Sequence, residues 1–258
     1  MARFDDSSNK TSQIRRRLFL AVIHCGVGVF LILLTFTGTL WRHESVHNES
    51  PVRKYWEELH NGKAFELSEA SFVVFSSTTH DAPRYLRFHE NWVQWILSRV
   101  YRPLRRTQDT ELLIDGGRAE CSERSQILKS IAEDCGYRCR FVGLGGHVVL
   151  EVEMDSQWYV ADPEFGLAFP FDIEQLCQES RTDLLRKALK TRALPEAHID
   201  DYLLILHSTE DNRRLPIGEP ISPRLHSIEQ LCQWLSWIVP LAFLLSSIGF
   251  FSSIRNTL

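Results

Sequence analysis

The chain has 258 residues, of which 44% are hydrophobic and 24% are charged, with a formal net charge of -4. This is enough material for one sizeable hydrophobic core, and the composition is that of an ordinary globular protein. A slightly acidic chain lacks the basic footprint of a nucleic-acid-binding protein, so we expect no nucleic-acid partner.

Two apolar segments predict membrane-spanning helices. Residues 18–41 contain no Asp, Glu, Lys or Arg, and a helix of that length, rising about 1.5 Å per residue, exceeds a hydrocarbon core of roughly 30 Å. Residues 234–254 also lack charge, although they include Pro240, and we place a second span at 231–254. The alternative for the first segment is a cleaved signal peptide, which has a shorter apolar stretch of about 7–15 residues. We prefer an uncleaved anchor.

The basic residues predict an orientation in the cell membrane. They cluster before the first span as Arg3, Lys10, Arg15, Arg16 and Arg17, whereas Arg42 is followed by no Lys or Arg until Arg53. The positive-inside rule therefore places the N-terminus in the cytoplasm. We expect a two-pass protein with cytoplasmic tails at 1–17 and 255–258. Its domain at 42–230 would be extracytoplasmic, either periplasmic or extracellular, with the lipid bilayer as a partner.

The intervening domain reads as an α+β fold without repeats. Residues 52–65 predict a helix, 71–76 (SFVVFS) a short strand, and 84–101 carry apolar residues at helical intervals that indicate core packing. Further on, 172–191 predict one amphipathic helix and 202–207 (YLLILH) a strand. A Pro-rich tract from Leu215 predicts a linker into the second span.

The secondary-structure pattern is clearest between residues 121 and 162. A helix begins at or just before Cys121 and runs to Asp134, and Gly136 follows as a C-terminal glycine should. Three strands follow at 138–144 (RCRFVGL), 147–154 (HVVLEVEM) and 157–162 (QWYVAD). Short turns between them predict antiparallel pairing.

Three residues in this stretch suggest chemistry. Cys121 lies at a helix start, where the helix dipole favours a thiolate, and the backbone N–H groups there can bind an oxyanion. His147 opens one strand and Asp162 closes the next, so an antiparallel hairpin would bring base and orienting carboxylate to the same end. Counted from a turn centred at Ser156, direct opposition of the two would need a bulge or a shifted turn.

The stretch from about Gly117 to Gly166 resembles the core of the transglutaminase-like superfamily of papain-type thiol enzymes. The matching segments are GGRAECSERSQILKSIAEDCGYRCRFVG, HVVLEVEM and WYVADPEFG, in that order. The resemblance implies a helix starting at the Cys and packed on an antiparallel sheet that carries His and Asp, with the core at about 112–170. It also implies that Cys121 is the nucleophile, His147 the base and Asp162 the orienting residue.

Two functions are therefore open. One is a membrane-anchored thiol enzyme that acts on peptide or carboxamide bonds of a substrate near the membrane surface, with water or an amine as acceptor. The other is an inactive binding module with the same fold. Two departures from the family pattern favour the module: Val149 replaces a frequent aromatic, and Glu120 precedes Cys121. A Cys121 sulfur close to the His147 ring, with Asp162 on the other side, favours the enzyme.

Metal ligands, disulfides and a further oxyanion donor are less clearly indicated by the sequence. Neither the spacing of Cys135 and Cys139 nor the scattered histidines predicts a metal site, and we expect no cofactor. In an oxidising exterior, two of Cys135, Cys139 and Cys177 could form a disulfide. By residue type, Gln108 and Trp95 are the upstream candidates for an additional oxyanion donor.

Overall fold

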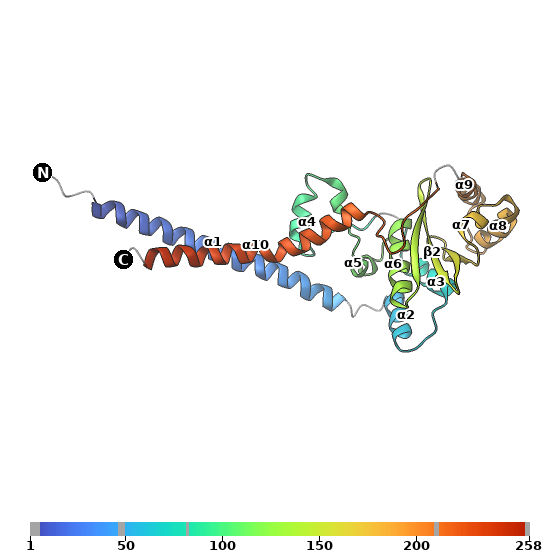
Figure 1. Cartoon of the computed structure of the whole chain (residues 1–258), viewed down its shortest axis with the longest axis horizontal. Coiled ribbons are helices and arrows are strands. Elements are labelled where there is room, and N and C mark those ends of the chain that lie inside the picture. Colours follow the sequence, from blue (N-terminus) through green and yellow to red (C-terminus); the bar gives the residue numbers. More distant parts are fainter. Residues whose placement is uncertain (1–5, 46–49, 81–82, 209–211, 256–258) are drawn as a thin grey trace. The chain divides into compact units, whose positions relative to one another are not determined.

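The structure is a computed structural model that describes residues 6–45, 50–80, 83–208 and 212–255, with side chains in the first helix for 11–40 (Figure 1). The outer ends of the predicted tails, 1–5 and 256–258, lie outside the described residues. The chain forms two compact units. A helical unit comprises Met1–His43, Leu86–Arg105 and Ser227–Leu258, and a globular unit comprises Glu44–Tyr85 and Arg106–His226.

The helical unit is built on two long helices that pack against each other, α1 (Asp6–Ser45) and α10 (Pro223–Arg255). Arg17 Nη1 donates to Ser253 Oγ at 2.7 Å, and Thr35 Oγ1 donates to the Ser236 carbonyl at 2.9 Å. Later residues of α1 thus meet earlier residues of α10, so the helices are antiparallel. Between these contacts, a Cβ at Gly28 would lie 2.8 Å from a Leu244 methyl and 3.1 Å from the Pro240 carbonyl oxygen, so a glycine here lets the two helices approach closely.

Both long helices are suited to a membrane. The segments Thr11–Leu40 and Pro223–Arg255 are long and apolar enough to cross one. Large apolar side chains point outward along both helices, among them Phe19, Phe30, Leu33, Leu245 and Ile248. The core helix of a water-soluble protein would bury most of its apolar residues, and these two helices do not.

The globular unit has a five-stranded sheet in the order β4-β3-β2-β1-β5, with antiparallel pairing throughout. The predicted strands are confirmed as β1 (Arg138–Leu144), β2 (His147–Met154) and β3 (Gln157–Asp162). The outer strands β4 (Leu167–Phe169) and β5 (Asn212–Arg214) were not predicted. Together with the helices, this sheet confirms the α+β class.

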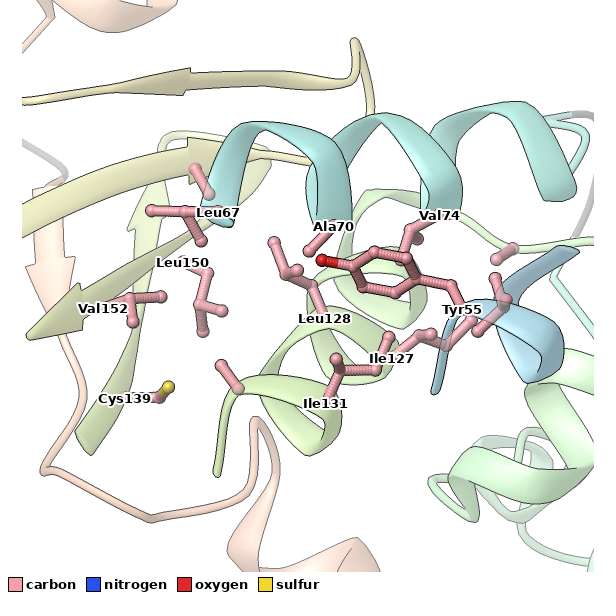
Figure 2. Close-up of a cluster of buried hydrophobic side chains, with 14 of the residues drawn as sticks. Tyr55, Leu67, Ala70, Val74, Ile127, Leu128, Ile131, Cys139, Leu150 and Val152 are labelled. Atoms are coloured by element: carbon pink, nitrogen blue, oxygen red, sulfur yellow. The ribbon is translucent and has the colours of Figure 1, made fainter. Parts of the chain in front are cut away.

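Helices cover both faces of the sheet. On one face, α2 (Pro51–His60), α3 (Leu67–Ser77), α5 (Thr110–Gly116) and α6 (Cys121–Asp134) share a core with β1 and β2. Figure 2 shows Ala70 and Val74 of α3 on the side of that helix that faces Leu128 and Ile127 of α6, whereas Leu67 lies beside Leu150 of β2. On the other face, a second core joins the sheet to α7 (Ile173–Leu176), α8 (Thr182–Lys190) and α9 (Glu196–His207).

A buried carboxylate fastens the second helical layer to the sheet. Glu151 of β2 is fully buried and accepts from Arg140 Nε at 2.7 Å and from Arg214 Nε at 3.0 Å. Its other oxygen accepts the N–H of Ile173 at 2.9 Å, at the start of α7. Burial by itself raises the pKa of Glu151, but these donors outweigh it and lower that pKa. The carboxylate therefore stays charged and links three strands to one helix.

Several sequence predictions were wrong. The apolar run 71–76 belongs to helix α3, and 202–207 ends helix α9, so neither is a strand. The first predicted helix ends at His60, because Gly62 has a φ of 95° that terminates it. The predicted helix at 172–191 is divided into α7, a 3-10 turn (Glu179–Arg181) and α8.

The segment 84–101 also differs from its prediction. Only α4 (Trp92–Leu97) is α-helical there, and a 3-10 turn (Arg102–Arg105) follows it. The Asn91 side chain accepts the N–H of Gln94 and so starts α4 late. Several of its apolar residues, such as Ile96 and Val100, are exposed and form no core, and Leu86–Arg105 clusters with the two long helices.

Candidate functional site

The site forms where α6 begins, at the end of the sheet where β2 starts and β3 finishes. Cys121 is the first residue of α6 and is half-buried. One turn later, Ser125 Oγ donates to the Val148 carbonyl at 3.1 Å, which fixes the first turn of α6 against the first residues of β2. The helix start and the strand start are thereby held together, and with them Cys121 and His147.

The hairpin register determines how His147 meets Asp162. Asp155 and Ser156, with φ of 51° and 62°, form a two-residue turn, and Leu150 pairs with Ala161. Continued by one step, this register sets Asp162 opposite Val149, so Asp162 and His147 are diagonal neighbours on one face of the sheet. The two residues are therefore not directly opposed. The turn is centred half a residue earlier than the sequence count assumed, and this shift sets them on one face without a bulge. His147 Nε2 lies 2.8 Å from Asp162 Oδ2.

The imidazole also interacts with Cys121. The Cys121 sulfur is among the groups that favour the charged imidazole. Because Nε2 is directed at Asp162, the remaining nitrogen, Nδ1, is the one available to sulfur. The imidazole of His147 is therefore placed between the Asp162 carboxylate and the Cys121 sulfur.

The electrostatic environment keeps His147 charged over a wide pH range. His147 is buried, which on its own lowers its pKa, but the Asp162 carboxylate and the Cys121 sulfur outweigh this effect and raise the pKa to about 10. At neutral pH the ring is thus an imidazolium between two acceptors.

Sequence reasoning missed one residue of the site, Tyr202 of α9. Its hydroxyl donates to Asp162 Oδ2 at 2.6 Å, and Glu164 N–H donates to Asp162 Oδ1 at 3.0 Å. Burial and the adjacent Asp162 charge raise the pKa of Tyr202 well above its ordinary value, so it remains a donor. Both carboxylate oxygens are therefore held in place. The Tyr202 ring also meets the His147 ring edge-on at 5.5 Å.

The side chain of Glu120 is paired with an arginine. Its two oxygens accept from Arg106 Nη1 at 2.7 Å and Nη2 at 3.1 Å, a bidentate pair. The backbone N–H of Glu120 donates to the Glu123 carboxylate at 3.0 Å, which fixes the helix start. The negative charge next to Cys121 is thus compensated locally.

A second arginine holds the loops that border the site. Arg124, nearly buried, donates to the Thr78 carbonyl at 2.6 Å and to the Glu164 carbonyl at 2.8 Å, and it forms an ion pair with the Glu164 side chain at 3.2 Å. His80 Nδ1 lies 2.8 Å from the same carboxylate. These contacts join the segment after α3 to the loop after β3, next to Asp162.

The remaining candidates are not brought to the triad. All six cysteines are free, which contradicts a disulfide among Cys135, Cys139 and Cys177. Gln108 donates its amide N–H to the Ser222 carbonyl at 3.2 Å, and Trp95 belongs to the helical unit. Within the described part of the chain, no group of three or more His, Cys, Asp or Glu side chains is placed to hold a metal ion.

A small cavity adjoins the first turn of α6. It measures about 190 Å³ and is lined by Ser122, Glu123 and Gln126 of α6 together with Gln108, Leu113 and Ile221.

No protein-family model matches the chain. No significant match is found among the curated proteins either.

We predict that Asp162→Asn changes the titration of His147. The loss of the carboxylate charge should lower the His147 pKa from about 10, and it should slow any reaction of Cys121 that needs the imidazolium by roughly 10²- to 10⁴-fold. Nuclear magnetic resonance of histidine-labelled full-length protein measures the midpoint. Asp200→Asn, on the exposed side of α9, is the control and should leave the midpoint unchanged.

The same shift has a consequence for stability. An unfolded histidine titrates near about 6.5, so a raised pKa stabilises the fold fully below that pH, and this contribution is lost as the pH rises through about 10. The difference in melting temperature between wild type and Asp162→Asn should therefore shrink from pH 6 toward pH 10. A difference that grows with pH would contradict the assignment.

We predict that Arg106→Gln slows alkylation of Cys121 at neutral pH. Removal of the guanidinium leaves the Glu120 carboxylate uncompensated one residue before Cys121, and a nearby negative charge opposes the negatively charged sulfur that alkylation requires. The double variant Arg106→Gln with Glu120→Gln should recover the wild-type rate, because it removes both charges. Equal rates in all three proteins would show that Glu120 has no influence on the thiol.

Proposed function

We propose that the protein is a membrane-anchored, transglutaminase-like thiol enzyme that cleaves or transfers acyl groups at peptide or carboxamide bonds. The observation that carries this proposal is the position of the His147 imidazole, which lies 2.8 Å from the Asp162 carboxylate and interacts with the Cys121 sulfur. This arrangement joins a nucleophile, a base and an orienting carboxylate in the order that acyl transfer requires. The helix start at the thiol and the antiparallel sheet beneath His147 and Asp162 agree with the papain-type core that the sequence resembles.

The first half-reaction is the attack of the Cys121 thiolate on the carbonyl carbon of the substrate. The C–S bond forms as the carbonyl π electrons move to oxygen, and the resulting oxyanion needs donors. Hydrogen bonding to the Glu120 carbonyl begins with the N–H groups of Glu123 and Arg124, so the N–H groups of Cys121 and Ser122 are the candidate donors. The C–N bond then breaks as the His147 imidazolium gives its proton to the leaving amine.

The second half-reaction releases the acyl group. His147, now neutral, takes a proton from water or from an amine, which attacks the thioester and expels the thiolate. Water gives a carboxylic acid and makes the enzyme a protease or amidase. An amine gives a new amide and makes it a cross-linking transferase.

The length and apolar composition of the two long helices support a membrane location for the proposed enzyme. We propose that α1 and α10 both span the bilayer, with the basic residues before α1 in the cytoplasm and the catalytic domain outside. The antiparallel packing of the helices supports this topology, because it returns the chain to the side where it began. A substrate protein or peptide would then lie at or near the outer membrane surface.

We predict that a fluorescent iodoacetamide at neutral pH labels Cys121 selectively in membranes. Burial raises the pKa of Cys139 to about 12, and it also raises the pKa values of Cys135 and Cys177, so these thiols react slowly. Cys121→Ala should therefore remove most of the label. His147→Ala should reduce the rate about 10-fold or more, because the thiolate loses its counter-charge.

Cys177→Ala is the matched control, since it also removes one half-buried thiol but lies outside the triad, and its labelling should equal that of wild type. Equal labelling of wild type and Cys121→Ala would refute the nucleophile. Selective labelling that does not depend on His147 would favour an inactive binding module.

A further inference from the structure

The segment Leu86–Arg105 is a closed loop that packs on itself. The N–H of Leu86 donates to the Arg105 carbonyl at 2.8 Å and closes its base. Inside the loop, Gln94 Nε2 donates to the Leu104 carbonyl at 3.2 Å, and the rings of Phe88 and Trp95 meet edge-on at 5.1 Å. The loop is therefore a structured element, and the orientation of its side chains is defined.

This loop exposes apolar side chains to the outside. Val100 is 91% exposed, and Phe88, Ile96, Leu97 and Tyr101 are exposed as well. Adjacent exposed apolar groups of this size are unfavourable in water and indicate an interaction surface. The loop thus needs a partner that covers an apolar surface.

The charge of the loop restricts the partner. Arg87, Arg99, Arg102 and Arg105 are all exposed, whereas the acidic residue of the loop, Glu90, is buried. Arg99 stacks on the Trp95 ring, with its guanidinium carbon 3.9 Å from the ring centroid. Basic side chains beside Trp and Tyr are typical of segments that lie at the boundary between lipid headgroups and acyl chains.

The contacts of the loop with α1 place the loop at the boundary between lipid headgroups and acyl chains. Trp92 Nε1 donates to Thr35 Oγ1 at 3.2 Å, and the His89 carbonyl oxygen is so close to Gly38 that a Cβ there would lie 1.9 Å from it. At about 1.5 Å per residue, Thr35 is roughly 26 Å beyond the start of the apolar run at Leu18, near the far boundary of a hydrocarbon core of about 30 Å.

The loop also lies beside α10, at the same depth along the helix pair as Thr35 of α1. A cavity of about 240 Å³ lies between the three elements, lined by Thr35 and Thr39 of α1, by residues from His89 to Trp92, and by Gln233, Ser236 and Trp237 of α10. The loop therefore lies beside the ends of both long helices, within the helical unit.

We propose that Leu86–Arg105 is an interfacial membrane element. It inserts Ile96, Leu97, Val100 and Tyr101 into the outer leaflet and places its arginines at the lipid phosphates. This inference rests on the proposed spanning topology of α1 and α10. It adds a third contact with the bilayer, made by a segment that does not cross it.

The test uses full-length protein in nanodiscs whose phosphatidylcholine carries bromine on the acyl chains near the headgroup. Val100→Trp adds a fluorophore at the most exposed apolar position of the loop, and Leu204→Trp adds one at a 70% exposed position of α9 in the globular unit. The added fluorescence, taken as the difference from wild type, should be quenched at least three-fold more strongly by brominated lipid for Val100→Trp than for Leu204→Trp.

Equal and weak quenching of the two added signals would overturn the inference and would indicate that the loop faces water or another protein. Failure of the underlying topology has a different signature, because wild-type protein would then be released from membranes by alkaline carbonate. Selective alkylation of Cys121 reports separately on the proposed catalytic site.

Discussion

The arrangement of the site depends on the register of the hairpin formed by β2 and β3. A two-residue turn at Asp155 and Ser156 fixes this register, and it makes His147 and Asp162 diagonal neighbours on the same face. A slip by one residue would turn one of the two side chains to the opposite face of the sheet. The hydrogen bond from Ser125 to the Val148 carbonyl holds the start of α6 against the start of β2, and this contact positions Cys121 near His147.

The site is supported from the second helical layer as well. Tyr202 reaches Asp162 from α9, and the buried Glu151 holds the start of α7 against the strand that carries His147. The orienting carboxylate therefore has donors on both oxygens, and its position is set by packing on both faces of the sheet. Cys121 begins a helix of one layer and the Asp162 carboxylate is held by Tyr202 from the other layer, so the arrangement of the site depends on the whole globular unit.

The sequence predicted the centre of this unit well and its periphery poorly, for physical reasons. The segments 121–134 and 138–162 have clear periodicity, a terminal glycine and short turns, and they fold as expected. By contrast, SFVVFS and YLLILH are short apolar runs whose periodicity does not separate a buried helix from a strand. In the fold, Ile199, Tyr202, Leu203 and Leu206 are buried at helical spacing, which becomes visible only when the helix is followed back to Glu196. Tyr202 was missed because the run 202–207 was predicted to be a strand.

The pairing of Glu120 with Arg106 is a tertiary contact across 14 positions, and no local sequence pattern reveals it.

The proposed acyl transfer by Cys121, with help from His147 and Asp162, can be tested directly by the reaction of full-length protein with an activated acetyl ester. Mass spectrometry and release of the leaving alcohol follow this reaction. We expect a burst of alcohol, an acetyl group on Cys121, and continued turnover that is lost in His147→Ala. An acetyl adduct that accumulates on Cys121 without turnover, or one that forms equally fast in His147→Ala, would contradict this proposal.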